Sequence, residues 1–369
     1  MSRQKIYTYL AAILIFTACT KPTADNTAIV IPDLTHWEES QESTQLSALF
    51  NDIRLVQLET NDSCLVDDNG KIIRYDSVYY VESNNEILQF DLNGKFLRKL
   101  SRIGSGPGEY IQLLDFNIVN RKDSAEIWIS STGGIYIYEP QTLAFKQHIP
   151  IEGHVTQFYY INDRTILTVK PEDITFKIYD MEGRLRKEFM EKDLANSMTS
   201  IAQFTEYKNL ILYQWDNTQE VVVYDPSMDS LYLANLFPPQ ESILTSKINR
   251  EYYEKYGFKE QVKKTMATYT TVVTSRCYKN EIMLILSYPD GHRSMVLHKD
   301  GKTVSYPFQQ KSRIENDLIQ TTDLTFLNTV IATTSNQGFL FFIGLERYPK
   351  DTPIEEENPL LLDVSGINL

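Results

Sequence analysis

The sequence contains no recognisable metal-binding or nucleophile motif. Of its five histidines, none stands in an HxH or HExxH spacing, which would let two side chains share a metal ion. Ser105 lies between two glycines, but Ile103 and Pro107 occupy the positions where a GxSxG nucleophile elbow needs glycine. These absences leave no catalytic residue, metal ligand or cofactor to assign.

No apolar run near the N-terminus is long enough to span a bilayer. Residues 6–16 are apolar and follow a basic start with Arg3 and Lys5, which is typical of a signal peptide over 1–18. Because Thr17 and Ala18 precede Cys19, the segment resembles a bacterial lipoprotein signal, which implies that Cys19 becomes the lipid-modified first residue. The alternative is ordinary secretion with an incidental cysteine. Thr20 is not the Asp that retains lipoproteins in the inner membrane, so the resemblance implies an outer-membrane lipoprotein on the periplasmic or cell-surface side.

Basic residues are fewer than acidic ones. Removing 1–18 leaves 34 Lys and Arg against 49 Asp and Glu, a net charge of about −15. Such a surface repels phosphate backbones and anionic lipid, so we expect no nucleic-acid partner and attachment to the membrane through the lipid at Cys19.

A short pattern, an apolar strand ending in an acidic turn, recurs about every 40 to 50 residues. It reads ILQFD at 87–91, IYIYE at 135–139, IYD at 178–180, VVVYD at 221–225 and MVL at 295–297, the last followed by DGK at 300–302. Repeats of this length, built from strands and turns, predict an all-β fold, a six-bladed β-propeller.

The strands group into quartets, labelled a to d outward from the propeller axis. We place blades one to five at 71–100, 114–149, 155–189, 201–236 and 268–308; in blade two, 126–130 and 134–138 are separate strands. Blade six offers three strands, at 318–326, 330–334 and 339–345. Residues 53–60 belong to no other quartet, so we expect them to form the outer strand of blade six and to close the ring.

The remaining segments lie outside the blades. Residues 19–50 form a tether or leader before the propeller at 51–369. Residues 237–266, between blades four and five, have the composition of a short helical insertion. Composition alone allows Cys64 and Cys277 to form a disulfide or to remain two free thiols. The assignment of strands to blades places them on opposite faces of the propeller, roughly 20 Å apart. Since a disulfide needs Cα atoms within about 7 Å, we predict none.

Residues 90–110 read FDLNGKFLRKLSRIGSGPGEY, which resembles the six-bladed β-propeller lipoproteins of Bacteroidetes, related in blade style to NHL-repeat proteins. The resemblance covers roughly 46–362 and implies a fold and a place in the cell envelope, but no catalytic residues. Glycines 104, 106 and 108 suit a tight crossover between blades rather than a phosphate cradle, because a strand follows them instead of a helix.

The d-to-a crossovers and b–c loops of a propeller share one face, where ligands commonly bind. On this face we expect the candidate ligand residues Arg102, Glu109, Tyr110, His154, Trp215, Asp216, Tyr252, Tyr253, Asp290, His292 and Arg293. For each residue alone, a role in packing or in a solvated loop is the alternative. The sequence favours a binding or scaffold lipoprotein for a peptide, glycan, small molecule or envelope protein; the alternative is a propeller-type hydrolase or lyase with a metal in the central channel.

Overall fold

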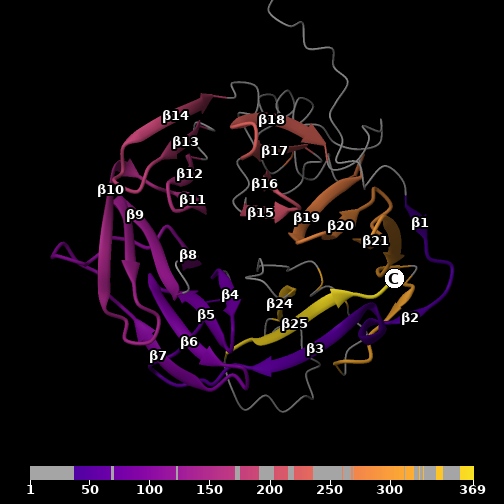
Figure 1. Ribbon diagram of the computed structural model, residues 1–369. Coiled ribbons are helices and arrows are strands. Elements are labelled where there is room, and N and C mark those ends of the chain that lie inside the picture. Colours follow the sequence, from indigo (N-terminus) through magenta and orange to yellow (C-terminus); the bar gives the residue numbers. More distant parts are fainter. Residues whose placement is uncertain are drawn as a thin grey trace, which may run out of the picture.

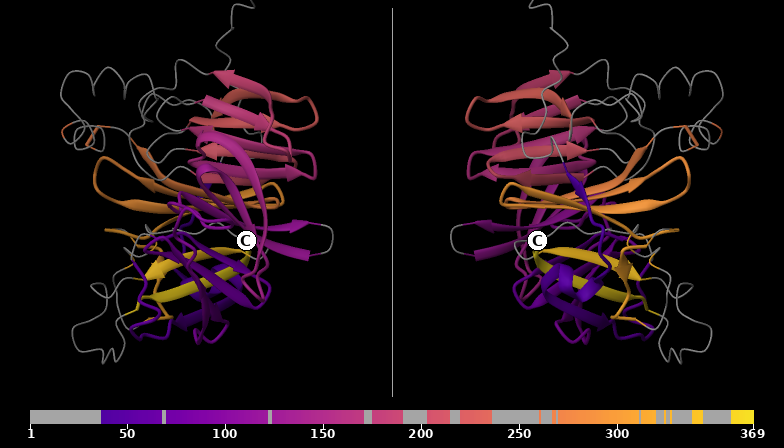
Figure 2. Two further views of the ribbon diagram at one scale, coloured as in Figure 1. Left: turned by 90° about the vertical axis from the view of Figure 1, so that its left-hand side faces the viewer. Right: turned by 90° about the vertical axis from the view of Figure 1, so that its right-hand side faces the viewer.

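The computed structural model describes residues 37–67, 70–121, 124–170, 175–190, 203–214, 220–235, 260, 267–268, 270–310, 312–319, 324, 327, 338–343 and 358–369. Its main sheets are six blades around a central axis, so the prediction of a six-bladed β-propeller is confirmed (Figure 1). Figure 2 shows the ring from two sides, with the strands running across its thickness.

Blades one, three and four are each a sheet of four antiparallel strands, which are ordered from the axis outward as they follow one another in the chain. Blade one has β4 (Ile72–Tyr75), β5 (Val78–Ser83), β6 (Glu86–Asp91) and β7 (Phe96–Leu100). Blade three has β11 (Gln157–Asn162), β12 (Thr165–Lys170), β13 (Thr175–Tyr179) and β14 (Leu185–Met190). Blade four has β15 (Gln203–Tyr207), β16 (Leu210–Gln214), β17 (Glu220–Asp225) and β18 (Ser230–Asn235).

Blade two has β8 (Asp115–Arg121), β9 (Ser124–Tyr138) and β10 (Phe145–His154). The first half of β9 pairs with β8 and its second half with β10, so the two separate strands predicted at 126–130 and 134–138 are parts of one element. Gly133 and Gly134 lie between the two halves with φ of 87° and 135°. Backbone of this kind is not regular strand and favours glycine, which explains why the sequence pattern breaks there.

Blade five has β19 (Thr271–Tyr278), β20 (Glu281–Ser287), β21 (Arg293–Lys299) and β22 (Lys302–Pro307). Strand β20 shows why an inner strand of a propeller has a continuous apolar run in its sequence. Met283 and Ile285 pack against the closing blade, whereas Ile282, Leu284 and Leu286 pack against blade four. Successive side chains of a strand point to opposite faces, and both faces of a blade are covered, so the strand is apolar at every position from Ile282 to Leu286.

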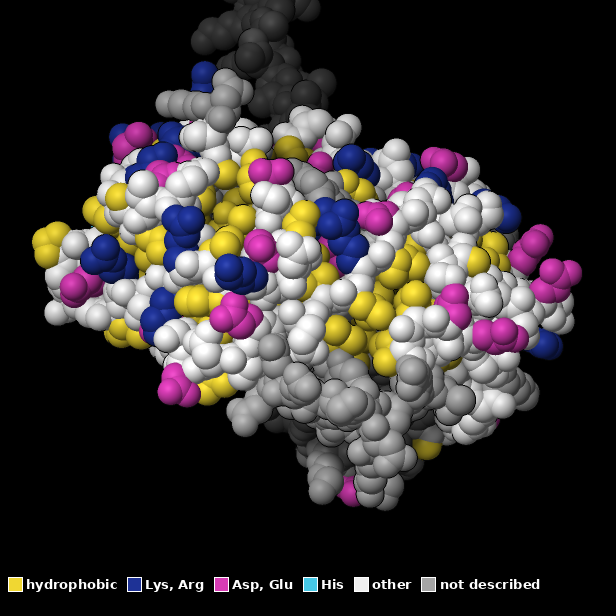
Figure 3. Space-filling view, turned by 90° about the horizontal axis from the view of Figure 1, so that it is seen from below, with side chains coloured by type: hydrophobic (Ala, Val, Ile, Leu, Met, Phe, Trp, Pro, Cys, Tyr) yellow, Lys and Arg dark blue, Asp and Glu magenta, His cyan; other side chains and the backbone are white. Residues whose placement is uncertain are grey.

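Six clusters of buried hydrophobic side chains hold the ring together, one between each pair of adjacent blades. The outer strands are more exposed and carry single apolar residues, among them Leu55, Leu97, Phe145 and Leu185. On the surface seen from below Figure 1, apolar side chains alternate with charged ones (Figure 3). Because every blade is packed on both sides, the core is a closed ring without a free end.

The acidic residue of the repeat organises the turn between the c and d strands. Oδ1 of Asp91 accepts hydrogen bonds from the backbone N of Asn93 and Lys95, at 2.8 and 2.9 Å. Gly94 follows with φ of 80°, and a Cβ there would lie 1.9 Å from the carbonyl oxygen of Gln57 in the preceding blade. Gly183 repeats this contact in blade three, 1.8 Å from the carbonyl oxygen of Pro150. The repeated acid therefore shapes the turn, and the glycine lets it approach the neighbouring blade.

The closing blade joins the two ends of the chain. It contains β24 (Phe339–Ile343), β25 (Leu360–Ile367) and, outermost, β3 (Phe50–Gln57). Strand β3 covers most of the segment predicted at 53–60 and pairs antiparallel with β25. The predicted closure by an N-terminal outer strand is confirmed.

The other strands of blade six were predicted less well. Strand β25 was missed. Of the strand predicted at 318–326, Leu318, Ile319 and Leu324 are described and none of them is in a strand, whereas its other residues lie outside the described part of the chain. These residues pack instead as loop side chains against the cluster between blade five and the closing blade. The predicted strand at 339–345 is observed as β24, and the one at 330–334 lies outside the described residues.

The end of the leader packs against the propeller. Strand β1 (Glu38–Glu39) pairs in parallel with β22, and β2 (Thr44–Gln45) pairs in parallel with β23 (Ile314–Glu315). A 3₁₀ helix over Leu46–Leu49 then buries both of its leucines. Strand β1 therefore covers the outer edge of blade five, and the two leucines of the 3₁₀ helix pack into the cluster between blade five and the closing blade before β3 begins.

The two cysteines of the propeller lie in different clusters. Cys64 packs between the closing blade and blade one, and Cys277 between blades four and five. Within the described part of the chain neither forms a disulfide, as the blade layout predicts.

Two predicted segments cannot be compared with the structure. The signal peptide and Cys19, and the helical insertion at 237–266 apart from Glu260, lie outside the described residues. Over the ranges that are described, no helix has the length and apolar character required to cross a membrane.

Candidate functional site

The predicted ligand residues of the first crossover have structural contacts. The ring of Tyr110 is fully buried, and its hydroxyl donates to the carbonyl oxygen of Asn85 at 2.8 Å. Oε2 of Glu109 accepts a hydrogen bond from the backbone N of Gly106 at 2.9 Å, and the backbone N of Tyr110 donates to the carbonyl oxygen of Arg102. The crossover is thereby fastened to the b–c turn of blade one, on the face where the sequence places it.

The remaining predicted residues lie elsewhere on the ring. Nδ1 of His154 lies 2.9 Å from the hydroxyl of Thr132 in blade two. In blade five, His292 stacks on Tyr288 with ring centroids 3.9 Å apart and contacts Asp290. Burial lowers the pKa of the neighbouring Arg293. Blade five lies across the ring from blade two, so these residues form separate groups (Figure 1). Trp215, Asp216, Tyr252 and Tyr253 lie outside the described residues.

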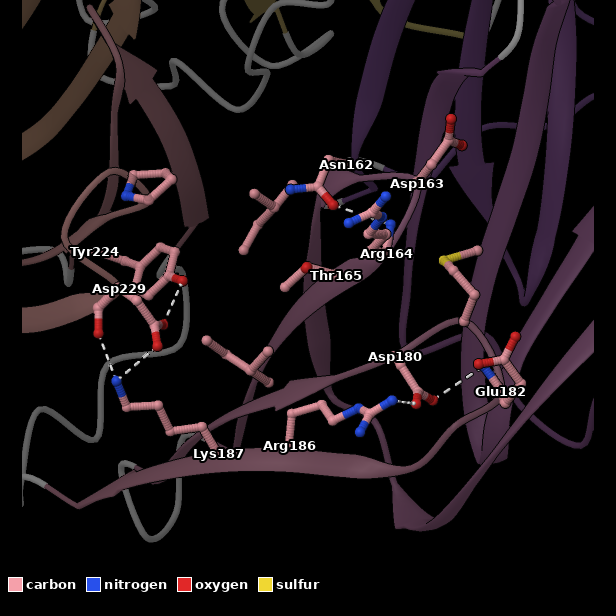
Figure 4. A pocket seen from close by; sticks show the side chains of 14 residues that line it. Asn162, Asp163, Arg164, Thr165, Asp180, Glu182, Arg186, Lys187, Tyr224 and Asp229 are labelled. Carbon is pink, nitrogen blue, oxygen red and sulfur yellow. Dashed lines mark hydrogen bonds and ion pairs between the residues drawn. The ribbon is translucent and has the colours of Figure 1, made fainter.

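A pocket of about 570 Å³ lies on the opposite face, between blades three and four. It is formed by the a–b and c–d turns of blade three and the c–d turn of blade four (Figure 4). Its lining residues are Ile161, Asn162, Asp163, Arg164, Thr165, Ile178, Asp180, Met181, Glu182, Arg186, Lys187, Tyr224, Pro226 and Asp229. The volume is within the range of small-molecule sites, and the lining combines apolar side chains with charged and hydroxyl groups.

Asp180, the acid of the repeat in blade three, holds one side of the pocket. Its Oδ1 accepts the backbone N of Arg184 at 2.8 Å, and its Oδ2 accepts Nε of Arg184 at 2.7 Å and Nη2 of Arg186 at 2.6 Å. Burial acts to raise the pKa of this carboxyl, but the hydrogen bonds and charges of the two arginines outweigh it and lower the pKa to about 2. Asp180 is therefore ionised and already neutralised by its own partners.

A second ion pair joins the two blades at the side of the pocket. Nζ of Lys187, on the outer strand of blade three, lies 2.9 Å from Oδ2 of Asp229 in blade four. Oδ1 of Asp229 accepts the hydroxyl of Tyr224 at 2.9 Å. The hydrogen bond from Lys187 lowers the pKa of Asp229, with Tyr224 adding to it against the effect of burial. Burial and Asp229 raise the pKa of Tyr224, so its hydroxyl stays protonated in the wall of the pocket.

The third side is the turn between β11 and β12. Oδ1 of Asp163 accepts Nε of Arg121 at 2.8 Å and the hydroxyl of Tyr160 at 3.0 Å. The backbone N of Arg164 donates to Oδ1 of Asn162 at 2.9 Å, which shapes the turn. Arg164 itself is exposed, and its guanidinium makes no ion pair with any described residue.

Sequence reasoning missed this pocket. The c–d turns of blades one and three carry the glycine that approaches the preceding blade, but the turn at 225–229 reads DPSMD and has none. Blade four instead reaches blade three through the Lys187–Asp229 side chains, with the pocket beside that contact. The c–d turn of blade two, EPQTLA at 139–144, lacks the glycine as well, so the missing glycine alone does not identify the pocket.

The described residues also bear on metal binding. No group of three or more His, Cys, Asp or Glu side chains within the described ranges is placed to hold a metal ion. The side chains that line the pocket offer ionic, hydrogen-bonding and apolar contacts to a ligand.

Solved structures share the fold at low identity. An exported protein of Bacteroides fragilis aligns with a TM-score of 0.65 and 15% identity, covering 91% of this chain and 99% of its own. A member of the DUF4221 family from Bacteroides vulgatus aligns with a TM-score of 0.52 and 10% identity, covering 86% of this chain and 97% of its own. No protein curated for its function matches. The model of one sequence family, described as a domain of unknown function (DUF4934), matches residues 29–360, and this chain belongs to that family.

Proposed function

We propose that this protein is an exported binding module of the cell envelope, and that its ligand occupies the pocket between blades three and four. The observation that carries the proposal is the pocket itself, in which two blades present charged, hydroxyl and apolar side chains around about 570 Å³. Propellers commonly bind ligands through loops that a rigid ring holds in place. The exported neighbour from Bacteroides fragilis supports a location outside the cytoplasm.

The membrane attachment is part of the same proposal. The basic and apolar leader before Thr17-Ala18-Cys19 supports lipidation at Cys19, and the segment at 90–110 supports the NHL-like lipoprotein family. Cys19→Ala is expected to abolish labelling with palmitate and to release the protein from the membrane fraction. If the variant still fractionates with membranes as the wild type does, the lipid is not the anchor.

The ligand site is tested by filling the pocket. Thr165 begins β12 and lines the pocket, so Thr165→Trp places a large ring inside it. Lys302→Trp is the matched control, since Lys302 is exposed at the c–d turn of blade five on the same face. Defined mono- and oligosaccharides and di- and tripeptides are screened by thermal shift, because a ligand that binds the native state raises its melting temperature.

We expect the probes that stabilise the wild type to stabilise Lys302→Trp equally and to leave Thr165→Trp unshifted. If every such probe stabilises Thr165→Trp as much as the wild type, or if none stabilises the wild type, the pocket is not the ligand site. The melting temperature of each variant without ligand confirms that it folds.

A further inference from the structure

Around the pocket, one cation is left without a carboxylate partner among the described residues. Four carboxylates line it, and each is engaged by a basic side chain: Asp163 by Arg121, Asp180 by Arg184 and Arg186, Glu182 by Arg184, and Asp229 by Lys187. Arg164 is the fifth cation of this group and is the lining cation that pairs with no carboxylate in the described chain. The carboxylates of the lining thus already have basic partners, whereas the guanidinium of Arg164 can pair with an anionic ligand without breaking an existing ion pair.

The position of Arg164 suits a ligand contact. Figure 4 shows Arg164 and Asn162 on one side of the pocket, with Asp180 and Arg186 across from them and Tyr224, Asp229 and Lys187 on a third side. Thr165 lies between these groups, and Ile178 is among the apolar lining residues. A ligand bound between the sides would thus meet the guanidinium with one end and the apolar lining with its body.

This arrangement is local in a chain whose overall charge is negative. The sequence carries a net charge of −13, so the chain as a whole does not attract anions and an anionic ligand would depend on local contacts such as that with Arg164. An arginine offers a planar pair of donors that matches a carboxylate, and such charge-assisted hydrogen bonds are among the stronger polar contacts.

We propose that the pocket between blades three and four binds a carboxylate-bearing ligand, with Arg164 as the residue that pairs with the carboxylate. The inference rests on the proposed function of the pocket and adds the chemical class of its ligand. A uronic acid of a glycan and an acidic side chain of a peptide both supply this group.

The experiment measures binding by calorimetry with D-glucuronate and N-acetyl-L-glutamate, each against its uncharged methyl ester. The wild type is expected to bind the acid of at least one pair about tenfold or more tightly than its ester. If the glucuronate pair shows this preference for the acid, the ligand is a sugar; if the N-acetyl-glutamate pair shows it, the ligand is a peptide. Binding of that acid is expected to weaken as NaCl is raised, because salt screens an exposed ion pair.

Arg164→Gln is expected to bring the affinity for the acid down to that for the ester, and Arg164→Lys to retain part of the difference. Lys302→Gln removes a cation from the same face outside the pocket and is expected to change neither affinity. An acid–ester ratio of one in the wild type, no binding of either acid, or an unchanged ratio in Arg164→Gln overturns the inference. Because the saccharide and peptide screen with Thr165→Trp is scored separately, the pocket can prove to be the ligand site even when its ligand is not a carboxylate.

Discussion

Oδ2 of Asp363 lies 2.7 Å from Nη1 of Arg74, and the two side chains are separated by 289 residues of sequence. Asp363 stands on β25 of the closing blade and Arg74 on the innermost strand of blade one, with side-chain exposures of 3% and 10%. The hydroxyl of Tyr79 donates to the same carboxylate oxygen at 2.7 Å. A buried charge pair thus joins the last blade to the first, beside the apolar cluster that closes the ring.

Removing the charge of Asp363 is expected to destabilise the whole propeller. Asp363→Asn leaves the size of the side chain almost unchanged but leaves the guanidinium of Arg74 buried without its counter-charge. Breaking a buried pair in this way costs about 3 to 5 kcal/mol in the free energy of unfolding. Urea unfolding followed by tryptophan fluorescence measures the change.

Asp52→Asn is the control for that substitution. Asp52 and Arg54 both lie on β3, which pairs with β25, and they form an ion pair at 3.7 Å with side chains 53% and 41% exposed. Exposed pairs contribute about 0 to 1 kcal/mol, so little change is expected. An equal effect of both substitutions would show that the buried pair does not stabilise the closure.

Gly183, the glycine in the c–d turn of blade three, is predicted to be required for the stability of the protein. Gly183→Ala meets both a φ of 78° and a carbonyl oxygen of Pro150 that would lie 1.8 Å from the new Cβ. Gly301→Ala meets a φ of 82° with no atom within 4 Å of the Cβ. The backbone conformation alone costs about 1 to 3 kcal/mol, so the loss of stability at Gly183 should exceed that at Gly301. Equal losses by urea unfolding would mean that the contact with Pro150 does not hold the blades together.

These glycines and acids also explain how much of the fold the sequence reveals. The repeated acid and glycine act within one turn, so their spacing identifies the blades without knowledge of the whole fold. Strand β25 was missed because Asp363 interrupts its apolar pattern, and only Arg74, far away in sequence, explains why a charge is buried there. The pocket was missed for the same physical reason, since the Lys187–Asp229 pair depends on how two blades approach each other.

Asn358 is predicted to stabilise the closed ring as well, where the chain passes from β3 to blade one. Its side chain is 1% exposed; Nδ2 donates to the carbonyl oxygens of Glu59 and Cys64, each at 2.7 Å, and Oδ1 accepts the backbone N of Val66 at 2.9 Å. Asn358→Ala would leave these three backbone groups without their partner, at roughly 1 to 3 kcal/mol for each group that stays buried and unsatisfied. Differential scanning calorimetry measures the loss, and a melting temperature equal to that of the wild type would contradict this role.

The thiol of Cys277 is expected to be unreactive in the native protein. Burial raises its pKa to about 12, against the opposing effects of the Thr205 hydrogen bond and of Arg276. At pH 8 only about one thiol in ten thousand is then ionised, and the thiolate is the reactive form. In a Cys19→Ser chain, iodoacetamide should label neither Cys64 nor Cys277 until the protein is denatured without reductant, and then both. Failure to label two thiols after denaturation would contradict the placement of the cysteines in separate clusters.

Glu82 is predicted to make the protein less stable as the pH rises. Burial raises the pKa of its carboxyl from 4.5 to about 7, Asp115 and Asp67 add to the rise, and the backbone N and charge of Lys71 oppose it. Between these two values the native state keeps a proton that the unfolded chain has lost, so stability declines with pH across that window. Glu82→Gln, which is uncharged throughout, should match the wild type near pH 4.5 and be more stable at pH 8 by on the order of 1 to 3 kcal/mol. Urea unfolding across this range measures the difference, with Glu152→Gln, an exposed carboxyl on β10, as a control that should follow the wild type. A constant difference between Glu82→Gln and the wild type at all pH values would mean that Glu82 does not titrate in this window.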